Sequence, residues 1–139
     1  MIKVEISKTV ASTILNEKGI VRILKFVYLK ERVTNAKVSS IFIGDKMMKR
    51  LHQKYLSKNS TTDVLTFVLE KNPLEVEICV NVNQAKRQAK RFGVTLKNEI
   101  TRLLVHCALH SLGYDDTTKI KRRKMFALQE KYILFVGRN

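Results

Sequence analysis

Stretches of apolar residues with strand-like and helix-like spacing alternate along the first half of the chain. Residues 2–6 alternate apolar and polar side chains, and residues 38–43 are largely apolar, so both predict strands. Between them, residues 20–32 predict a helix, because their apolar side chains recur at helical spacing on one stripe. Asp45 is expected to cap a further helix over residues 47–56.

Two more strands follow in the middle of the chain. They cover residues 64–69 and 76–80, and a turn that contains Pro73 separates them. Because both segments are almost continuously apolar, we expect each strand to be buried on its two faces.

The last third of the chain predicts three helices, over residues 84–92, 99–112 and about 118–134. Asn98 is expected to cap the second of these helices, and Gly113 is expected to end it. The whole pattern predicts one α+β domain over residues 1–139. In it, a small mixed sheet of about four strands packs with about five helices.

The chain carries a large excess of positive charge. Lys and Arg number 27 and Asp and Glu number 12, which gives a formal net charge of +15. Such a charge attracts polyanions and favours binding to a phosphate backbone through counterion release. No apolar run approaches the roughly 20 residues that span a bilayer, and no basic segment has the aromatic apolar face of a membrane-surface helix. We therefore expect nucleic acid as the partner and no membrane; the alternative is a basic surface that serves only solubility.

Cysteine usage and the first residues indicate a cytoplasmic protein. Cys79 and Cys107 are the two cysteines, and we expect both to be buried thiols in a reducing compartment. Residues 1–10 mix charged with apolar side chains, which is not the pattern of a signal peptide.

The segment HCALHSLGYDD, residues 106–116, carries the most specific chemistry. His106 and His110 are four residues apart on a predicted helix, so both imidazoles project from one face and can share one ion. After the bend at Gly113, Asp116 supplies a third ligand. Three protein ligands with a fourth position left to water are the arrangement of a catalytic zinc site. We therefore expect one divalent ion, Zn²⁺, at the end of this helix in the C-terminal half.

Other interpretations of these residues are weaker. Two histidines at this spacing also occur on a partly buried face without any metal. A zinc peptidase needs a Glu after the first His as general base, and this position is Cys107. Cys107 projects about 100° around the helix from His106, so we do not expect it to be a ligand. His52, the third histidine, is expected to be solvated in a polar helix.

The sequence resembles the YbeY family of bacterial metal-dependent endoribonucleases. The family signature H-G-x-L-H-L-x-G-Y-D-H is matched by HCALHSLGYDD, and T-D-V-L-S-F-P is matched by TDVLTFV at 62–68. M-F-x-x-Q-E is matched by MFALQE at 125–130, EICVNVNQAKRQA matches a further block, and Glu99 matches a family Glu. These matches occur in family order over about residues 40–135.

The resemblance implies that the family's three zinc histidines fall on His106, His110 and Asp116, with Asp in place of the third His. A carboxylate is a competent zinc ligand, although it lowers the effective charge of the ion. A family Arg implicated in activity is replaced by Leu56, and the nearby Lys58 is expected to take part of its role.

Three residues are expected to assist catalysis. Arg102, one turn before His106, and Lys58 would neutralise charge that develops on the phosphate. Asp115, or alternatively Glu99, would orient a ligand histidine through its second nitrogen. Two basic stretches are expected to hold the RNA backbone: Lys86, Arg87, Lys90 and Arg91 on one helix, and KIKRRK at 119–124.

The function implied by the resemblance is a single-strand-specific, zinc-dependent endoribonuclease. It would act in ribosomal RNA maturation at the 16S 3′ end and in ribosome quality control, with RNA and the small ribosomal subunit as partners. One alternative is a non-catalytic ribosome assembly or RNA-binding factor with a vestigial or structural metal site, which Leu56 and Asp116 favour. A second alternative is a zinc hydrolase of small anionic substrates.

Overall fold

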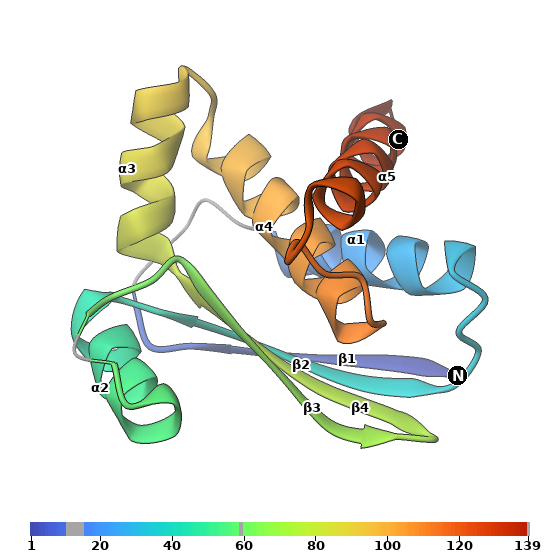
Figure 1. The fold of residues 1–139 in the computed structure, drawn as a ribbon, viewed down its shortest axis with the longest axis horizontal. Helices are drawn as coiled ribbons and strands as arrows, with labels where there is room; N and C mark the ends of the chain where they lie inside the picture. The colour runs from blue at the N-terminus through green and yellow to red at the C-terminus, as the bar shows by residue number, and fades with distance from the viewer. Residues whose placement is uncertain (11–15, 59, 139) are drawn as a thin grey trace.

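A computed structural model describes residues 1–10, 16–58 and 60–138 of the chain. The elements follow one another as β1 (Ile2–Lys8), α1 (Glu17–Lys30), β2 (Ala36–Ile43), α2 (Asp45–Leu56), β3 (Val64–Lys71), β4 (Leu74–Asn81), α3 (Val82–Phe92), α4 (Leu96–Ser111) and α5 (Lys119–Arg138) (Figure 1). Within the described ranges, the α+β class with four strands and five helices is confirmed. No helix among these residues is long and apolar enough to cross a membrane.

The four strands form one mixed sheet in the order β1-β2-β4-β3. β1 and β2 are parallel, as are β2 and β4, whereas β3 runs antiparallel to β4. The register aligns Val38 of β2 with Val4 of β1 and Val76 of β4. Four helices, α1, α3, α4 and α5, lie on one side of the sheet, and α2 lies on the other (Figure 1).

The main core lies between the sheet and the larger group of helices, and α4 is its central helix. Ten of the side chains of α4 are buried, whereas α2 buries two. A smaller apolar cluster lies on the opposite face of the sheet under α2. It is formed by Ile43, Met48, Leu65 and Cys79.

Both helix caps predicted from the sequence are wrong. Asp45 is the first residue of α2, Gly44 is the cap position, and the Asp45 N–H donates to Asn83 Oδ1 at 3.0 Å. α4 begins earlier than predicted because the Thr95 hydroxyl accepts a hydrogen bond from the Asn98 N–H at 3.0 Å, which places Asn98 inside the first turn. A capping side chain must reach an amide two or three positions on, and Thr95 meets this condition.

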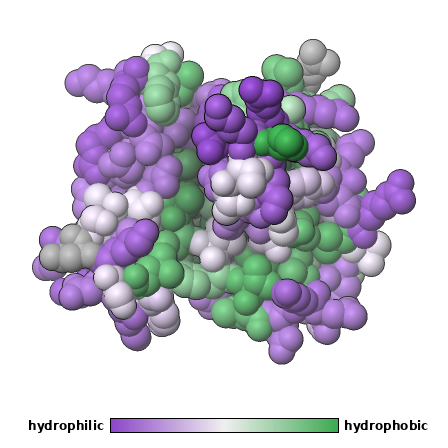
Figure 2. Space-filling model, in the orientation of Figure 1, coloured by the Kyte–Doolittle hydropathy of each residue, from purple (hydrophilic) through white to green (hydrophobic). Residues whose placement is uncertain are grey.

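The expected two-sided burial is correct for the second half of β4 and wrong for β3. β3 is an edge strand, and Leu65 is its only buried residue. Val68 and Leu69 remain 41% and 50% exposed, at the point where the register of this edge strand is shifted between Val68 and Glu70. Figure 2 shows apolar surface at the bottom of the view, on the side where β3 and β4 lie.

Candidate functional site

His106 and His110 lie on one face of α4, as their spacing predicts. Their ring centroids are 6.1 Å apart and the ring planes differ by 8°, so the two imidazoles are stacked in parallel. His110 is exposed, and His106 is partly buried. Both residues belong to α4, whose position is set by its ten buried side chains. The two rings therefore lie side by side in the C-terminal half of this helix.

Gln129 of α5 fixes the ring of His106. The side chain of Gln129 is buried, and its Oε1 lies 2.9 Å from His106 Nδ1. An amide oxygen only accepts hydrogen bonds, so Nδ1 is the donor. In the neutral ring, the lone pair is therefore on Nε2, which is the nitrogen available for a metal or a proton. From the sequence, Asp115 or Glu99 was expected in such an orienting role; Gln129 was missed, although MFALQE at 125–130 contains it.

The chain turns back after α4 as the sequence predicts. Gly113 has a φ of +99°, a conformation that glycine adopts without a steric penalty. The next residue, Tyr114, donates from its hydroxyl to Glu31 Oε1 at 2.6 Å, and Tyr132 of α5 donates to the other oxygen of Glu31. Burial raises the pKa of the Tyr132 hydroxyl, and its hydrogen bond to Glu31 raises it further. One carboxylate at the end of α1 thus holds both the turn and α5.

The two aspartates of the turn have different surroundings. Asp115 accepts hydrogen bonds from the Thr117 hydroxyl at 2.8 Å and the Thr117 N–H at 3.1 Å, and it lies 3.5 Å from Lys121 Nζ. The hydrogen bonds to Thr117 lower the pKa of the Asp115 carboxyl. Asp116 is exposed, and its backbone carbonyl accepts from Arg122 Nε at 3.4 Å. Asp115 therefore acts here as a local anchor for the start of α5.

The arrangement supplies part of a metal site. The imidazole pair has the donor chemistry that Zn²⁺ prefers. Over the described residues, however, no group of three His, Cys, Asp or Glu side chains is placed to hold an ion together. The third ligand predicted from the sequence, Asp116, is thus not brought to the two histidines in this structure.

Arg102 is held between carboxylates. Its Nη1 binds Glu130 of α5, and its Nε lies 3.8 Å from Glu99 Oε1. Glu99 is almost completely buried, and its other oxygen accepts from Gln88 of α3 at 2.7 Å. The positive charge of Arg102 is therefore already compensated. Arg102 links α4 to α5, and Glu99 links α4 to α3.

Cys107 is a buried thiol, as expected, and it faces β3. Burial raises its pKa to about 12; a hydrogen bond with Thr66 opposes this shift, and the nearby charge of Asp63 adds to it. The thiol is therefore protonated at neutral pH in this structure. The contacts with Asp63 and Thr66 bring the TDVLTFV segment against α4.

The end of α2 holds the remaining predicted residues. Lys58 is exposed, and within the described part of the chain its ammonium forms no hydrogen bond or ion pair. Leu56, the last residue of α2, is 48% exposed. The expectation of a solvated His52 is wrong. Its ring is buried, and Nδ1 lies 2.8 Å from the Ser60 carbonyl oxygen, so His52 anchors the loop after α2.

The basic stretches are solvent-exposed. All four basic side chains of α3 are exposed, as is the KIKRRK segment of α5. Arg87 differs from the others, because it forms two hydrogen bonds to Asp45 at 2.7 and 3.0 Å. In Figure 2, hydrophilic surface covers most of the α3 region at the upper left.

Comparison with known proteins identifies the family of this chain. A family model described as endoribonuclease YbeY matches residues 2–137. A protein named endoribonuclease YbeY from Thermodesulfovibrio yellowstonii is 41% identical over 102 residues, which cover 69% of this chain and 64% of that protein. A protein of the same name from Thermosipho melanesiensis is 33% identical over 117 residues, covering 84% of this chain and 85% of that protein.

A solved structure shares the fold. The solution structure of TM1509 from Thermotoga maritima superposes with a TM-score of 0.69 at 26% sequence identity. The match covers 96% of this chain and 88% of that chain.

Proposed function

Because the chain belongs to the endoribonuclease YbeY family, we propose that it cleaves RNA during ribosomal RNA processing. The proposal extends to single-stranded substrate at the 3′ end of 16S RNA, to the small ribosomal subunit as partner, and to the cytoplasm as location. The observation that supports cleavage best is the parallel pair His106 and His110, with the Nε2 lone pair of His106 directed by Gln129.

We also propose that this pair binds one divalent ion, Zn²⁺, with Asp116 as third ligand. A bound divalent ion acidifies water and polarises a phosphate oxygen. The chain itself contributes orientation: Gln129 holds the His106 ring, and Arg102 holds α5 against α4 through Glu130. For Asp116 to take part, its carboxylate must move toward the imidazoles, since it is not grouped with them in this structure.

The basic surfaces of α3 and α5 would bind the RNA backbone. Their exposed ammonium and guanidinium groups attract phosphates and release counterions when RNA binds. Lys58, which is exposed and without an ion pair among the described residues, is the cation we assign to the charge that develops at the cleaved phosphate.

Cleavage is tested with the His110→Ala variant and a single-stranded ribosomal RNA fragment. We expect cleavage to fall by at least about a hundredfold, because a metal site contributes several kcal/mol to transition-state stabilisation. Gln53→Ala, at an exposed residue of α2, is the control and should retain cleavage. Equal rates for wild type and His110→Ala would remove the pair from the mechanism.

Metal content is measured on the wild type and on three variants. We expect about one zinc ion per wild-type chain, little in His106→Ala, and a clear loss in Asp116→Ala. Asp115→Ala should retain the metal, because that carboxylate is engaged with Thr117. Full metal content in Asp116→Ala would show that the third ligand is misassigned.

A second candidate function is a non-catalytic RNA-binding assembly factor. The placement of Asp116 outside any group of three ligands and the presence of Leu56 favour it. A wild-type protein that is loaded with metal and binds RNA, yet does not cleave it, would support this alternative.

A further inference from the structure

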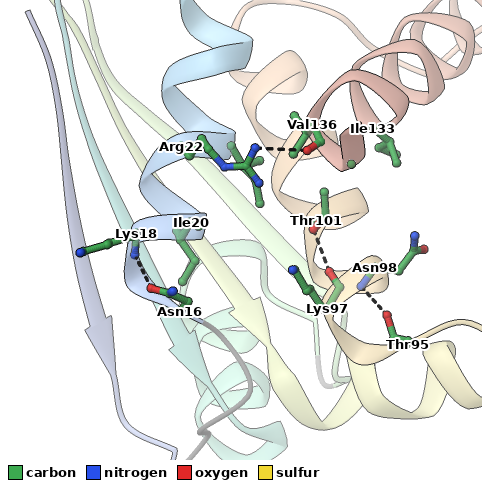
Figure 3. Close-up of a pocket in the computed structure, with 13 residues that line it drawn as sticks. Asn16, Lys18, Ile20, Arg22, Thr95, Lys97, Asn98, Thr101, Ile133 and Val136 are labelled. Atoms are coloured by element: carbon green, nitrogen blue, oxygen red, sulfur yellow. Dashed lines mark hydrogen bonds between the residues drawn. The ribbon is translucent and has the colours of Figure 1, made fainter. Parts of the chain in front are cut away.

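A pocket of about 570 Å³ lies where α1 and α4 begin and α5 ends. Figure 3 shows its side chains coming from these three helices. The pocket is lined by Asn16, Lys18, Gly19, Ile20, Arg22, Ile23, Thr95, Lys97, Asn98, Thr101, Ile133, Val136 and Gly137. It shares no lining residue with the histidine pair, which lies toward the other end of α4.

The inner part of the pocket is apolar. Four lining residues, Ile20, Ile23, Ile133 and Val136, belong to the main core and are at most 9% exposed. The volume lies within the roughly 300–1,000 Å³ of small-molecule sites, and such sites are mostly apolar with a few placed polar groups. An inorganic anion alone would leave most of this space and its apolar wall unused.

The rim of the pocket is cationic. Lys18, Arg22 and Lys97 line it, and no Asp or Glu does. Three cations among thirteen residues match the share expected from 27 Lys and Arg in 139 residues, so their number alone decides nothing. Within the described ranges none of the three has an ion-pair partner. Arg22 and Lys97 lie between the three helices, whereas Lys18 extends toward β1 (Figure 3).

The arrangement of Arg22 is fixed. Its Nη1 donates to the Val136 carbonyl oxygen at 3.2 Å, at the end of α5 (Figure 3). This hydrogen bond uses one of the five donors of the guanidinium, so the side chain can still bind an anion. Two helices also begin at the pocket, with Asn16 and Thr95 as their caps, and helix N-termini favour negative charge.

One polar atom at the pocket lacks a partner. Asn98 Oδ1 is buried and accepts no hydrogen bond from the described residues. This oxygen exposes almost no surface, toward the pocket or toward solvent, so it is not a contact for a ligand. The combination of apolar floor and cationic rim matches a base and a phosphate.

We propose that this pocket binds a nucleoside monophosphate unit, either within an RNA chain or as a free mononucleotide. The RNA form rests on the proposed function, whereas the mononucleotide form does not. Along α4, Thr101 at the pocket and His110 are separated by about 13 Å, from a rise of 1.5 Å per residue. At 3.6 residues per turn the two residues project from opposite faces of α4, so a strand that occupies both places must pass around this helix.

The test is an amide NMR titration of the whole chain with adenosine 5′-monophosphate. We expect shift changes at Gly19, Lys97 and Gly137. Lys97→Glu should weaken binding about tenfold, the size that loss of one charge-assisted hydrogen bond gives. Because a Glu in the first turn of a helix is favourable, this variant is expected to fold. Lys25→Glu, the same charge change on α1 outside the pocket, should bind like the wild type.

A second variant, Gly19→Leu, tests whether the ligand needs the free volume of the pocket, because it changes this volume without changing the charge. A Cβ placed at Gly19 meets no atom within 4 Å, so Gly19→Leu adds its side chain toward open pocket space in a helix that favours Leu over Gly. We expect it to abolish mononucleotide binding without unfolding the chain. Unchanged binding in Gly19→Leu would overturn the proposal.

Titrations with inorganic phosphate and with a short RNA show which chemical class of ligand the pocket binds and whether that ligand is part of an RNA chain. Inorganic phosphate that gives the same shifts with the same affinity would overturn the proposal, because base and ribose would then contribute nothing. Tighter binding of a short RNA than of the mononucleotide at these amides would identify an RNA residue as the ligand; the reverse order would identify the free mononucleotide.

Separate outcomes would contradict the pocket proposal and the proposed function. His110→Ala should bind the mononucleotide like the wild type while it loses cleavage. A wild type that cleaves RNA but shows no shifts at Gly19 and Lys97 would overturn the pocket alone. A wild type that shows the shifts but cleaves no RNA would overturn the proposed function alone.

Discussion

The ring of His106 is held by Gln129, a residue 23 positions away on another helix. Removing this acceptor frees the ring to rotate and to exchange tautomers. In Gln129→Ala we expect RNA cleavage to fall about 10- to 100-fold, the usual cost of losing the residue that orients a ligand histidine. The measurement is the cleavage rate at saturating RNA, together with the free energy of unfolding.

Gln53→Ala is the matched control for Gln129→Ala. Gln53 is an exposed glutamine on α2, so its removal should leave the cleavage rate unchanged. A Gln129→Ala protein with wild-type cleavage would contradict the assigned orienting role.

Single residues were predictable where local spacing determines their placement. The shared face of His106 and His110 follows from helical geometry, and the bend at Gly113 follows from its lack of a Cβ. The partners of Gln129 and His52 depend on tertiary packing between segments that are separate in sequence, so spacing does not reveal them.

Among the elements, the junction of β4 and α3 depends on Asn81. Its buried side chain donates to Asp45, to Thr61 and to the Thr62 carbonyl, and it accepts from the Gln84 N–H at 3.2 Å. Asn81→Ala removes a helix cap and leaves buried groups without partners. We expect a loss of about 2–4 kcal/mol in the free energy of unfolding, measured by urea denaturation.

Asn83→Ala provides the comparison. Asn83 is exposed and accepts one hydrogen bond, from the Asp45 N–H, so we expect a loss of about 1 kcal/mol or less. Equal losses for the two variants would show that the buried network around Asn81 adds nothing beyond capping.

The existence and type of the elements followed from periodicity, whereas their ends did not. β1 and α1 were found with bounds shifted by a few residues. The start of α4 was misplaced because Thr95 and Asn98 are both capping residue types, and only the backbone conformation decides between them. The exposure of β3 depends on its edge position, which an apolar run does not encode.

At the scale of the whole molecule, the net charge of +15 predicts salt-sensitive RNA binding. The logarithm of the affinity for single-stranded RNA should fall linearly with the logarithm of salt concentration, by about 0.7 per phosphate neutralised. Lys90→Gln with Arg91→Gln removes two exposed cations from α3. We expect the slope to decrease by about 1.4, as measured by fluorescence anisotropy.

The control removes two positive charges from a different surface and measures the same dependence of RNA affinity on salt concentration. Lys3 and Lys37 are exposed register partners in β1 and β2. Lys3→Gln with Lys37→Gln should leave the slope nearly unchanged. Equal effects of the two double variants would show that the total charge, and no particular surface, attracts the RNA.

The α+β class and the single mixed sheet were predictable from the sequence, but the strand order was not. Apolar patterning indicates which segments form strands and helices, and it carries no information on which strands become neighbours. β3 and β4 pair as the short turn between them suggests, whereas nothing in the local pattern places β2 between β1 and β4.

The sheet separates a large apolar interior from the small cluster under α2. Regions with few buried apolar contacts open at lower free energy than the rest of a domain. We therefore expect α2 to open at a lower free energy than the helices on the other side of the sheet, which carries the histidines. Because Lys58 directly follows α2, such an opening would change the distance between this cation and a bound strand.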